Sequence, residues 1–460
     1  MADAADNQVD VVVLGLGVGG EEVAGRLAEA GLSVVGIERR LVGGECPYWG
    51  CIPSKMAIRA ANLLAEGRRI PEMAGQSTVR PDWGLVADRL RDEATDDWND
   101  EVAVRRLEGK GARFVRGSGR LVGPGRVRVG DQEFEARAGV VVGAGTAPVI
   151  PPIEGLADTP YWTNRHALEA KELPSTLVVL GGGVVGTELA QAYARFGVAV
   201  RVAEAADRLL ELEEPEASDV ASRALEADGV EVRTSSRGVR VAYREGEFTL
   251  TLDKGDELTG ERLLVAVGRK PNLADLGVEA VGLDPHDRML RVDDRMRAGD
   301  RLWAVGDITG RGPFTHVAMY QAGIATRDIL GQPGPGADYR ALPRVTFTDP
   351  EVAAVGLTEK QAREAGRRLR IGVAKTPSTA RGWIHKAGND GVIKLVVDAD
   401  RDVLLGATSA GPAGGEVLGA LTVAVHAQVP VEQLRHMIYA YPTFHRGIED
   451  ALRDLEPADS

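Results

Sequence analysis

The sequence predicts an α/β protein in which one βαβ unit occurs twice and an α+β domain follows. The first observation is a buried-strand pattern that runs into a glycine-rich turn, near the N-terminus and again near residue 177. The second is a change of composition after residue 338, where strand and helix patterns continue without such a turn. The third is the length of 460 residues, which exceeds a single hydrophobic core and so predicts several domains.

The first βαβ unit begins with the apolar strand pattern of Asp10–Leu14. Three glycines of its turn have separate tasks: Gly15 permits the tight turn, Gly17 lets the backbone approach a pyrophosphate, and Gly20 lets helix and strand pack closely. The N-terminus of the helix that follows attracts phosphate. The second strand ends at Glu38, whose carboxylate is placed to accept hydrogen bonds from an adenosine ribose.

The second βαβ unit has the same order of parts. The strand pattern of Leu177–Leu180 leads into Gly181, Gly183 and Gly186, and the next strand ends at Glu204. One glycine-rich turn of this kind is weak evidence, because such turns are common, but two complete copies with matching acidic ends are specific. We therefore predict two Rossmann-like dinucleotide-binding domains.

Two such domains imply two dinucleotides, of which one can be a tightly held flavin and the other an exchanging nicotinamide. A carboxylate at Glu204 accepts a ribose 2′-hydroxyl and repels a 2′-phosphate, which favours NADH. Arg201 and Arg208 flank this position, so NADPH stays an alternative.

The composition excludes some classes of function. A net charge of -13 argues against nonspecific binding of nucleic acid. No apolar run approaches the roughly 18 residues needed to span a membrane, and the start, MADAADNQVD, lacks the apolar region of a secretion signal. We expect a cytoplasmic protein with a short flexible N-terminal segment and no metal site.

The only two cysteines, Cys46 and Cys51, form a redox-active pair on this interpretation. A helical pattern covers residues 56–66, and Pro53 suits its first turn, so Cys51 is expected at a helix N-terminus, which favours the thiolate over the thiol. Such a thiolate can donate charge to an adjacent flavin ring. Cys46, expected across a short loop, would be the outer thiol that attacks a substrate.

Lys55 follows Cys51 by about one helical turn. A solvated surface lysine is the plain alternative, but this placement favours a role beside the flavin. Glu188, just after the second glycine-rich turn, is a candidate partner for it.

The segment Gly43–Lys55 (GGECPYWGCIPSK) resembles the redox-active motif of the class I flavoprotein disulfide reductases, which include dihydrolipoamide dehydrogenase and mercuric reductase. The resemblance covers nearly the whole chain. It continues in Ala138–Ile153, Val265–Asn272, Leu302–Asp307, Thr315–Ala318 and Arg344–Thr358.

The resemblance implies a homodimer in which each active site is completed by the partner's C-terminal domain. It implies FAD contacts at Gly145, Gly306 and Asp307, the last on the ribityl chain, and places Gly268 at the end of the nicotinamide domain. It also implies that hydride passes from nicotinamide to flavin, that electrons enter the disulfide through Cys51, and that Cys46 carries them onward. The domains would be residues 1–148 and 273–338 for FAD, 149–272 for NAD(P), and 339–460 for the dimer interface.

The C-terminal motif departs from the family pattern. Disulfide-exchanging members carry His-Pro-Thr-x-Ser-Glu, whereas this chain has Tyr441 at the histidine position and Arg446 at the glutamate position. Tyrosine, with an ordinary pKa near ~10, is a poor base at neutral pH but can donate a proton. This favours a reductase over a dihydrolipoamide dehydrogenase. His445 could replace the base, or could be a surface histidine where a helix starts.

The sequence does not identify the electron acceptor. A small disulfide is the first hypothesis, and a metal ion or quinone is the second. Mercuric reductases share the tyrosine, but this chain lacks their C-terminal cysteine pair. A third hypothesis is a flavin-containing structural or regulatory dimer with vestigial cysteines. Pro47, Tyr48 and Trp49 stand where the family has smaller residues, and they either shape a substrate channel or pack in the interior.

Overall fold

The computed structural model describes residues 7–455. The predicted N-terminal segment before residue 7 and the last residues, 456–460, lie outside this range. The chain divides into two compact units, each built from separate stretches of sequence. Unit 1 comprises Met1–Pro53, Asp88–Val149 and Arg269–Asp338, and unit 2 comprises Ser54–Ala87, Ile150–Gly268 and Tyr339–Ser460. The domain limits given above stay a prediction.

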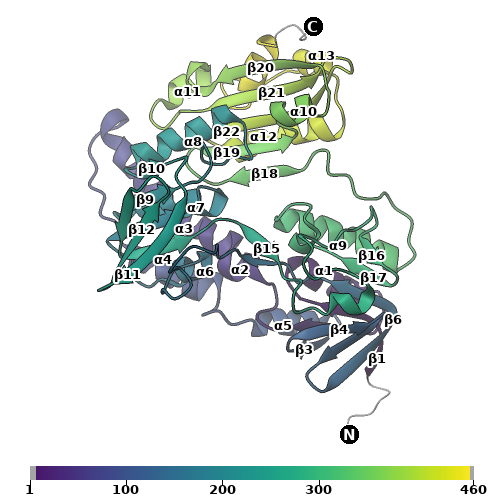
Figure 1. The fold of residues 1–460 in the computed structure, drawn as a ribbon. Helices are drawn as coiled ribbons and strands as arrows, with labels where there is room; N and C mark the ends of the chain where they lie inside the picture. Colours follow the sequence, from purple (N-terminus) through teal and green to yellow (C-terminus); the bar gives the residue numbers. More distant parts are fainter. Residues whose placement is uncertain (1–6, 456–460) are drawn as a thin grey trace. The chain divides into compact units, whose positions relative to one another are not determined.

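Unit 1 is built on one mixed sheet whose main path runs β16-β17-β6-β1-β2-β3, with β5 on β6 and β4 on β5. Strands β1, β2, β3, β6 and β17 pair in parallel, so segments far apart in the sequence lie side by side (Figure 1). A short pair, β7 with β15, stands apart from this sheet. The strands are β1 Gln8–Leu14, β2 Val34–Glu38, β3 Arg113–Arg116, β4 Gly119–Gly123, β5 Arg126–Val129, β6 Gln132–Val142, β7 Thr146–Pro148, β15 Arg269–Pro271, β16 Arg297–Gly299 and β17 Leu302–Ala304.

The helices of unit 1 connect these strands and carry the residues of interest. They are α1 Val18–Glu29, α2 Glu45–Trp49, the π-helix η2 Leu90–Ala94, α5 Glu101–Gly109, the 3-10 helices η3 Val278–Val281 and η4 Asp307–Thr309, and α9 Thr315–Ile329. Two helices, α3 Cys51–Met73 and α4 Trp83–Arg89, begin in one unit and end in the other.

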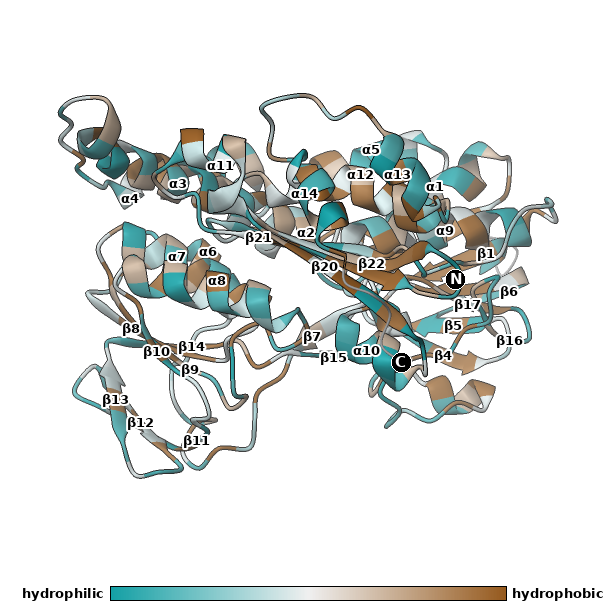
Figure 2. Ribbon diagram, turned by 90° about the horizontal axis from the view of Figure 1, so that it is seen from above, coloured by the Kyte–Doolittle hydropathy of each residue, from teal (hydrophilic) through white to brown (hydrophobic). Residues whose placement is uncertain are grey.

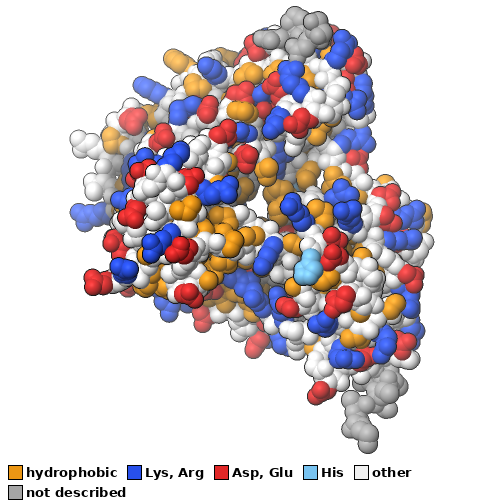
Figure 3. Space-filling view, in the orientation of Figure 1, with side chains coloured by type: hydrophobic (Ala, Val, Ile, Leu, Met, Phe, Trp, Pro, Cys, Tyr) orange, Lys and Arg blue, Asp and Glu red, His pale blue; other side chains and the backbone are white. Residues whose placement is uncertain are grey.

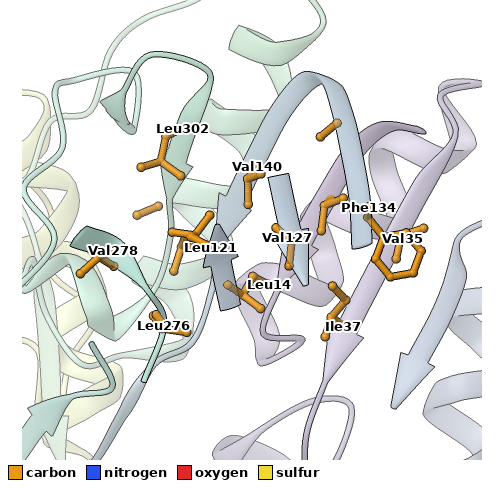
Figure 4. Close-up of a cluster of buried hydrophobic side chains, with 14 of the residues drawn as sticks. Leu14, Val35, Ile37, Leu121, Val127, Phe134, Val140, Leu276, Val278 and Leu302 are labelled. Atoms are coloured by element: carbon orange, nitrogen blue, oxygen red, sulfur yellow. The ribbon is translucent and has the colours of Figure 1, made fainter. Parts of the chain in front are cut away.

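The core of unit 1 consists of aliphatic side chains from strands that are distant in sequence. Figure 4 shows one cluster, in which Leu14 and Ile37 of the parallel strands meet Leu121 and Val127 of the β4–β5 hairpin. Phe134 of β6 is fully buried in the same cluster. This packing fixes the carboxyl ends of β1 and β2, where the glycine-rich turn and Glu38 lie.

Unit 2 contains three sheets. The second βαβ unit forms the parallel sheet β10-β9-β8-β14, beside which lie the antiparallel sheet β11-β12-β13 and the C-terminal antiparallel sheet β18-β19-β22-β21-β20. The strands are β8 Thr176–Leu180, β9 Ala199–Ala203, β10 Glu231–Arg233, β11 Gly238–Arg244, β12 Glu247–Leu252, β13 Glu257–Gly260, β14 Arg262–Val265, β18 Pro343–Thr346, β19 Glu351–Gly356, β20 Leu369–Lys375, β21 Val392–Asp398 and β22 Val403–Gly411.

The C-terminal sheet of unit 2 packs against helices through a separate apolar cluster. Strands β21 and β22 are coloured hydrophobic in Figure 2, whereas α7 and α8 mix hydrophobic and hydrophilic residues, as helices with one buried face do. The helices of unit 2 are α6 Asn164–Glu169, α7 Val184–Arg195, α8 Pro215–Ala227, α10 Glu359–Glu364, the 3-10 helix η5 Thr376–Ser378, α11 Ala380–His385, α12 Gly414–His426, α13 Val431–His436 and α14 Gly447–Arg453.

The predicted α/β class, both βαβ units and the C-terminal α+β domain are confirmed. The helices expected at residues 415–427 and 431–437 are α12 and α13, and the helix expected at residues 56–66 is the middle of the longer α3. Strands β11, β12 and β13 were not predicted. They are short, and each buries one face in the apolar cluster that it shares with β8 and β14.

The distribution of surface charges and the apolar character of the helices agree with the composition. Lys and Arg side chains are interspersed with Asp and Glu on the face drawn in Figure 3. Among residues 7–455, no helix has the length and apolar character needed to cross a membrane.

Unit 2 contains a buried lysine, Lys394, that links helix α8 to the C-terminal sheet. Lys394 of β21 is 4% exposed and bonds to Glu214, at 3.0 Å, and to Glu216, at 2.8 Å. It also pairs with Glu359 at 2.8 Å, and the pKa of that carboxyl is lowered, although burial opposes the effect of Lys394 and Arg363. Because Glu214 and Glu216 flank the start of α8, Lys394 fastens this helix to the C-terminal sheet.

Replacing Lys394 with Met is expected to lower the free energy of unfolding by about 3–5 kcal/mol, because the buried Glu214 carboxylate loses its cation. Urea unfolding measures the change, with Lys375→Met on the exposed edge of β20 as the matched control. Lowering the pH should reduce the stability of the wild type more than that of Lys394→Met. The folded-state pKa of Glu359 is lowered, so its contribution to stability is lost as the pH falls through that pKa. Equal unfolding midpoints for the two lysine variants would contradict the assignment.

Candidate redox and dinucleotide site

The first glycine-rich turn leaves no room for side chains where helix meets strand. Gly15 has φ +93°, and a Cβ at Gly20 would lie 2.0 Å from the Gly15 carbonyl oxygen. The Glu38 carboxylate closes the turn: it accepts hydrogen bonds from the backbone N–H of Leu16, at 2.9 Å, and of Arg40, at 2.7 Å. The tasks predicted for Gly15 and Gly20 and the need for an acidic residue at Glu38 thus have a geometric basis.

The second turn repeats this geometry. Gly181 has φ +109°, and a Cβ at Gly186 would lie 2.0 Å from the Gly181 carbonyl oxygen. Glu204 accepts from the backbone N–H of Gly182 at 2.6 Å and of Ala206 at 2.7 Å. The carboxylates at both predicted positions therefore order the turn itself.

The outer sides of both turns are open. A side chain at Gly17 would meet only the Gly143 carbonyl oxygen, 3.8 Å away, and one at Gly183, Gly145 or Gly268 would meet nothing within 4 Å. Gly17 and Gly183 are the N-caps of α1 and α7, and neither helix has a side-chain cap there. Free backbone N–H groups beside open space fit the pyrophosphate of a dinucleotide.

Asp307 is a largely buried carboxyl group at the start of η4. Burial raises its pKa, and the hydroxyl of Thr146, which donates to it at 2.9 Å, opposes this rise. Arg269 donates to the same Thr146 hydroxyl at 2.8 Å. Gly306, at φ +82°, turns the chain into η4. A buried carboxyl with acceptor capacity left over fits the hydroxyl groups of a ribityl chain. Thr146 and Arg269 were missed by the sequence analysis.

The two arginines that flank Glu204 in the sequence are engaged elsewhere. Arg201 donates to the Thr259 carbonyl oxygen at 2.8 Å and lies 3.3 Å from Glu231. Arg208 donates to the Glu211 carbonyl oxygen at 2.7 Å.

The cysteine pair lies at the junction of two helices. Cys51 is the first residue of α3, with Pro53 in its first turn, as expected. Cys46, predicted across a short loop from Cys51, lies in the short helix α2, and Gly50 separates the two helices. A Cβ at Gly50 would lie 3.1 Å from the Glu45 carbonyl oxygen, so the chain reverses closely between the two sulfurs. Both cysteines are free thiols, Cys51 exposed and Cys46 partly buried.

Thr315, the first residue of α9, lies beside the sulfurs. Its Oγ1 is 3.4 Å from the Cys51 Sγ. The pKa of the Cys46 thiol is raised well above its ordinary value, first by its hydrogen bond to Cys51 and then by burial, while Thr315 acts in the opposite direction. The raised pKa of Cys46 and the position of Cys51 at the helix N-terminus both favour negative charge on Cys51.

The segment before Cys46 is joined to the first glycine-rich turn. Gly43 donates its backbone N–H to the Leu16 carbonyl oxygen at 2.7 Å and bridges to Gly17. A Cβ at Gly44, which has φ +70°, would lie 2.8 Å from the Gly17 Cα. The paired glycines in the sequence were the available signal for this close approach.

Lys55 and Glu188 form the expected ion pair within unit 2. The Lys55 Nζ lies 2.8 Å from one carboxylate oxygen of Glu188, and the other oxygen accepts from the backbone N–H of Phe347 at 2.8 Å. The Lys55 Nζ also lies 4.8 Å from the centre of the Phe347 ring. Glu188 is 4% exposed, so Lys55 is held in place and is not the freely solvated lysine of the alternative.

The C-terminal motif lies just before α14. Tyr441 is 69% exposed, and the Arg446 guanidinium lies 5.1 Å from the centre of its ring. His445 is partly buried, with its ring 6.1 Å from that of Tyr439, and it precedes α14 instead of starting it. The roles of Tyr441 and His445 stay predictions.

Comparison with known families gives matches along the chain. Residues 9–322 match the family described as pyridine nucleotide-disulphide oxidoreductase, and residues 342–452 match the dimerisation domain of that family. A dihydrolipoyl dehydrogenase of Bacillus subtilis is 32% identical over 95% of this chain and 94% of its own length. A mercuric reductase of Shigella flexneri is 33% identical over 95% of this chain and 79% of its own.

Solved structures agree with this assignment. The HOCl-induced flavoprotein disulfide reductase RclA from Escherichia coli has a TM-score of 0.83 at 28% identity, covering 97% of this chain and 99% of that one. LpdA from Mycobacterium tuberculosis has a TM-score of 0.85 at 27% identity, with coverages of 96% and 99%. The dimerisation domain supports a homodimer. The chain is thus an enzyme that uses FAD and NAD(P)H and belongs to the pyridine nucleotide-disulphide oxidoreductase family.

Proposed function

We propose that this enzyme reduces a small disulfide with electrons from NADH, by way of the Cys46–Cys51 pair. The observation that carries the proposal is the arrangement of the two sulfurs: Cys51 at the N-terminus of α3, Cys46 hydrogen-bonded to it, and the Thr315 hydroxyl alongside. This arrangement separates the roles of the thiols. Cys51 carries the negative charge in the resting dithiol, whereas Cys46 is protonated. Cys46 attacks the acceptor once it has lost that proton.

The preference for NADH is supported by charge at the second turn. A carboxylate at Glu204 would repel a 2′-phosphate, and Arg201 and Arg208 each donate to another group. Glycines 15, 17, 20 and 145, with Glu38, Gly306 and Asp307, would hold FAD. Glycines 181, 183, 186 and 268, with Glu204, would hold the nicotinamide dinucleotide.

Bound FAD would supply the two-electron chemistry that links the nicotinamide to the disulfide. Within the chain, we propose that Lys55 supplies positive charge near this centre and that Glu188 fixes its position. The support is that both Glu188 oxygens are already used, one on Lys55 and one on the Phe347 backbone, so the pair has a single geometry.

We propose that Tyr441 gives a proton to the thiolate that leaves the reduced acceptor. Reduction of a disulfide needs proton delivery, and a phenol can provide it without the missing histidine–glutamate pair. The exposure of Tyr441 and the nearby Arg446 cation support a site open to a small anionic or polar acceptor. His445 is the alternative donor.

A second candidate acceptor is a metal ion or a quinone. Relatives include mercuric reductases, and one solved neighbour is described as a Cu(II) complex of RclA, with a TM-score of 0.85 at 27% identity. Among residues 7–455, no cluster of three or more His, Cys, Asp or Glu side chains could hold a metal ion. A metal acceptor would therefore meet the two sulfurs alone, as a substrate. A cytoplasmic location and the domain limits stay predictions from the sequence.

Replacing Cys46 with Ser is expected to halve the electron uptake from NADH, because the variant cannot form a disulfide. Anaerobic titration followed by absorbance should show two equivalents of NADH consumed by the wild type and one by the variant. Disulfide reduction should disappear while quinone reduction continues. Two equivalents in the variant, or one in the wild type, would exclude the proposed disulfide route.

Replacing Tyr441 with Phe should slow disulfide reduction by about 100-fold, the typical contribution of a general acid. Quinone reduction, which needs no thiolate protonation at this position, should be unchanged. His445→Gln is the matched control. If the histidine variant loses the activity and the tyrosine variant keeps it, the proton donor is His445.

Replacing Glu188 with Gln should slow flavin reduction by NADH by about 100-fold, the effect of misplacing a catalytic group by about 1 Å. Stopped-flow absorbance measures the rate. Glu231→Gln is the control, since Glu231 also pairs with a cation in unit 2 but is more exposed. Equal rates in both variants would remove Lys55 and Glu188 from the proposed site.

A further inference from the structure

The helix that carries Cys46 is held by a series of hydrogen bonds that the function described above does not use. The Trp98 Nε1–H donates to the Tyr48 carbonyl oxygen at 3.2 Å, and the Tyr48 hydroxyl donates to the Val42 carbonyl oxygen at 3.1 Å. The Val42 backbone N–H donates to Asp100 at 2.7 Å, and Asp100 pairs with Arg116 at 2.6 Å. We call Val42, Tyr48, Trp98 and Asp100 the α2 anchor.

Three of the four residues of the α2 anchor are buried in unit 1, and Trp98 is partly buried. Val42 is fully buried, Tyr48 is 6% exposed and Asp100 is 7% exposed. Burial and the Asp100 charge raise the pKa of Tyr48 to about 12, so its hydroxyl remains a donor at neutral pH. Tyr48 therefore packs in the interior instead of shaping a substrate channel, the two roles considered for the large residues between the cysteines.

Trp98 occupies an unfavourable backbone conformation. Asp96, Asp97 and Trp98 have φ values of 49°, 52° and 55° in succession, directly after the π-helix η2. Aspartate tolerates this left-handed region, but it is an outlier for a bulky residue. Such a conformation persists where the surrounding contacts over-determine it, and this happens most often at functional sites.

The helix α2 cannot hold its own position. It comprises only Glu45–Trp49, its N-cap Gly44 has no side-chain cap bond, and Gly50 ends it. A helix of this length has no independent stability. The place of Cys46, two residues before Tyr48, therefore depends on the bonds that reach α2 from outside.

We propose that Trp98 is a positioning residue that holds Cys46 within bonding reach of Cys51 and so sets the redox equilibrium of the pair. This inference rests on the proposed disulfide route. When two glutathione thiols reduce the pair, the Cys46–Cys51 bond breaks and one glutathione disulfide forms. Two electrons and two protons pass from glutathione to the two cysteines. The anchor favours the bonded state, because it lowers the cost of keeping the two sulfurs together.

The test is the equilibrium of the pair in the purified holoenzyme against mixtures of glutathione and glutathione disulfide, read by thiol alkylation and mass. Trp98→Phe keeps an aromatic ring but removes the N–H donor together with part of the ring volume. We expect its equilibrium to move about fivefold toward the dithiol, which is about 20 mV for a two-electron couple. Trp83→Phe is the matched control, because it loses the same part of the ring and because Trp83, which is buried, also donates its N–H to a backbone carbonyl oxygen, that of Ala170, at 2.8 Å.

A second variant, Tyr48→Phe, removes another bond of the anchor and is expected to move the equilibrium in the same direction. A purely structural role would lower the melting temperature of Trp98→Phe and Trp83→Phe alike without moving the potential. Equal potentials for the wild type and both anchor variants would overturn the inference. A wild-type pair that does not exchange with glutathione at all would instead overturn the proposed function.

Discussion

The structure depends on one steric constraint, the approach of a helix to the strand that precedes it at a glycine-rich turn. At Gly20 and Gly186 a side-chain carbon would lie 2.0 Å from the carbonyl oxygen of the first glycine. With hydrogen there, each helix N-terminus points its free N–H groups at the space beyond the turn. Carboxylates at Glu38 and Glu204 then fix both turns with the same pair of backbone bonds.

The redox segment is attached to this frame. Gly43 and Gly44 lie against the first turn, so the chain that leads to Cys46 starts from a fixed point. Cys51 begins a long helix, and the electrostatics of its N-terminus distinguish the two sulfurs: the raised pKa belongs to Cys46. The same helix carries Lys55 into the ion pair with Glu188. Only a few residues thus separate the first glycine-rich turn contacts at Gly43 from the thiol at Cys51.

Much of the site was predictable because its signals are local. Glycine spacing, an acidic residue at a strand end and proline in a helical first turn each act within a few residues, so the two βαβ units and the helix at Cys51 followed from the sequence. The position of Cys46 in a helix was missed, because α2 is too short for periodicity to reveal it. Thr315, Thr146 and Trp98 were missed as partners, since each meets its neighbour across a long stretch of chain.

The sequence by itself determined the class of the protein, the number of dinucleotide folds and the identity of the reactive pair, because these depend on backbone conformations that particular residues permit. The tertiary structure added the hydrogen bond and the burial that raise the pKa of Cys46, and it alone decided which buried groups hold the pair. It also decided that the flanking arginines donate hydrogen bonds to backbone carbonyl oxygens of Thr259 and Glu211. Those properties depend on burial and on contacts between distant segments, and spacing along the chain carries no information about either.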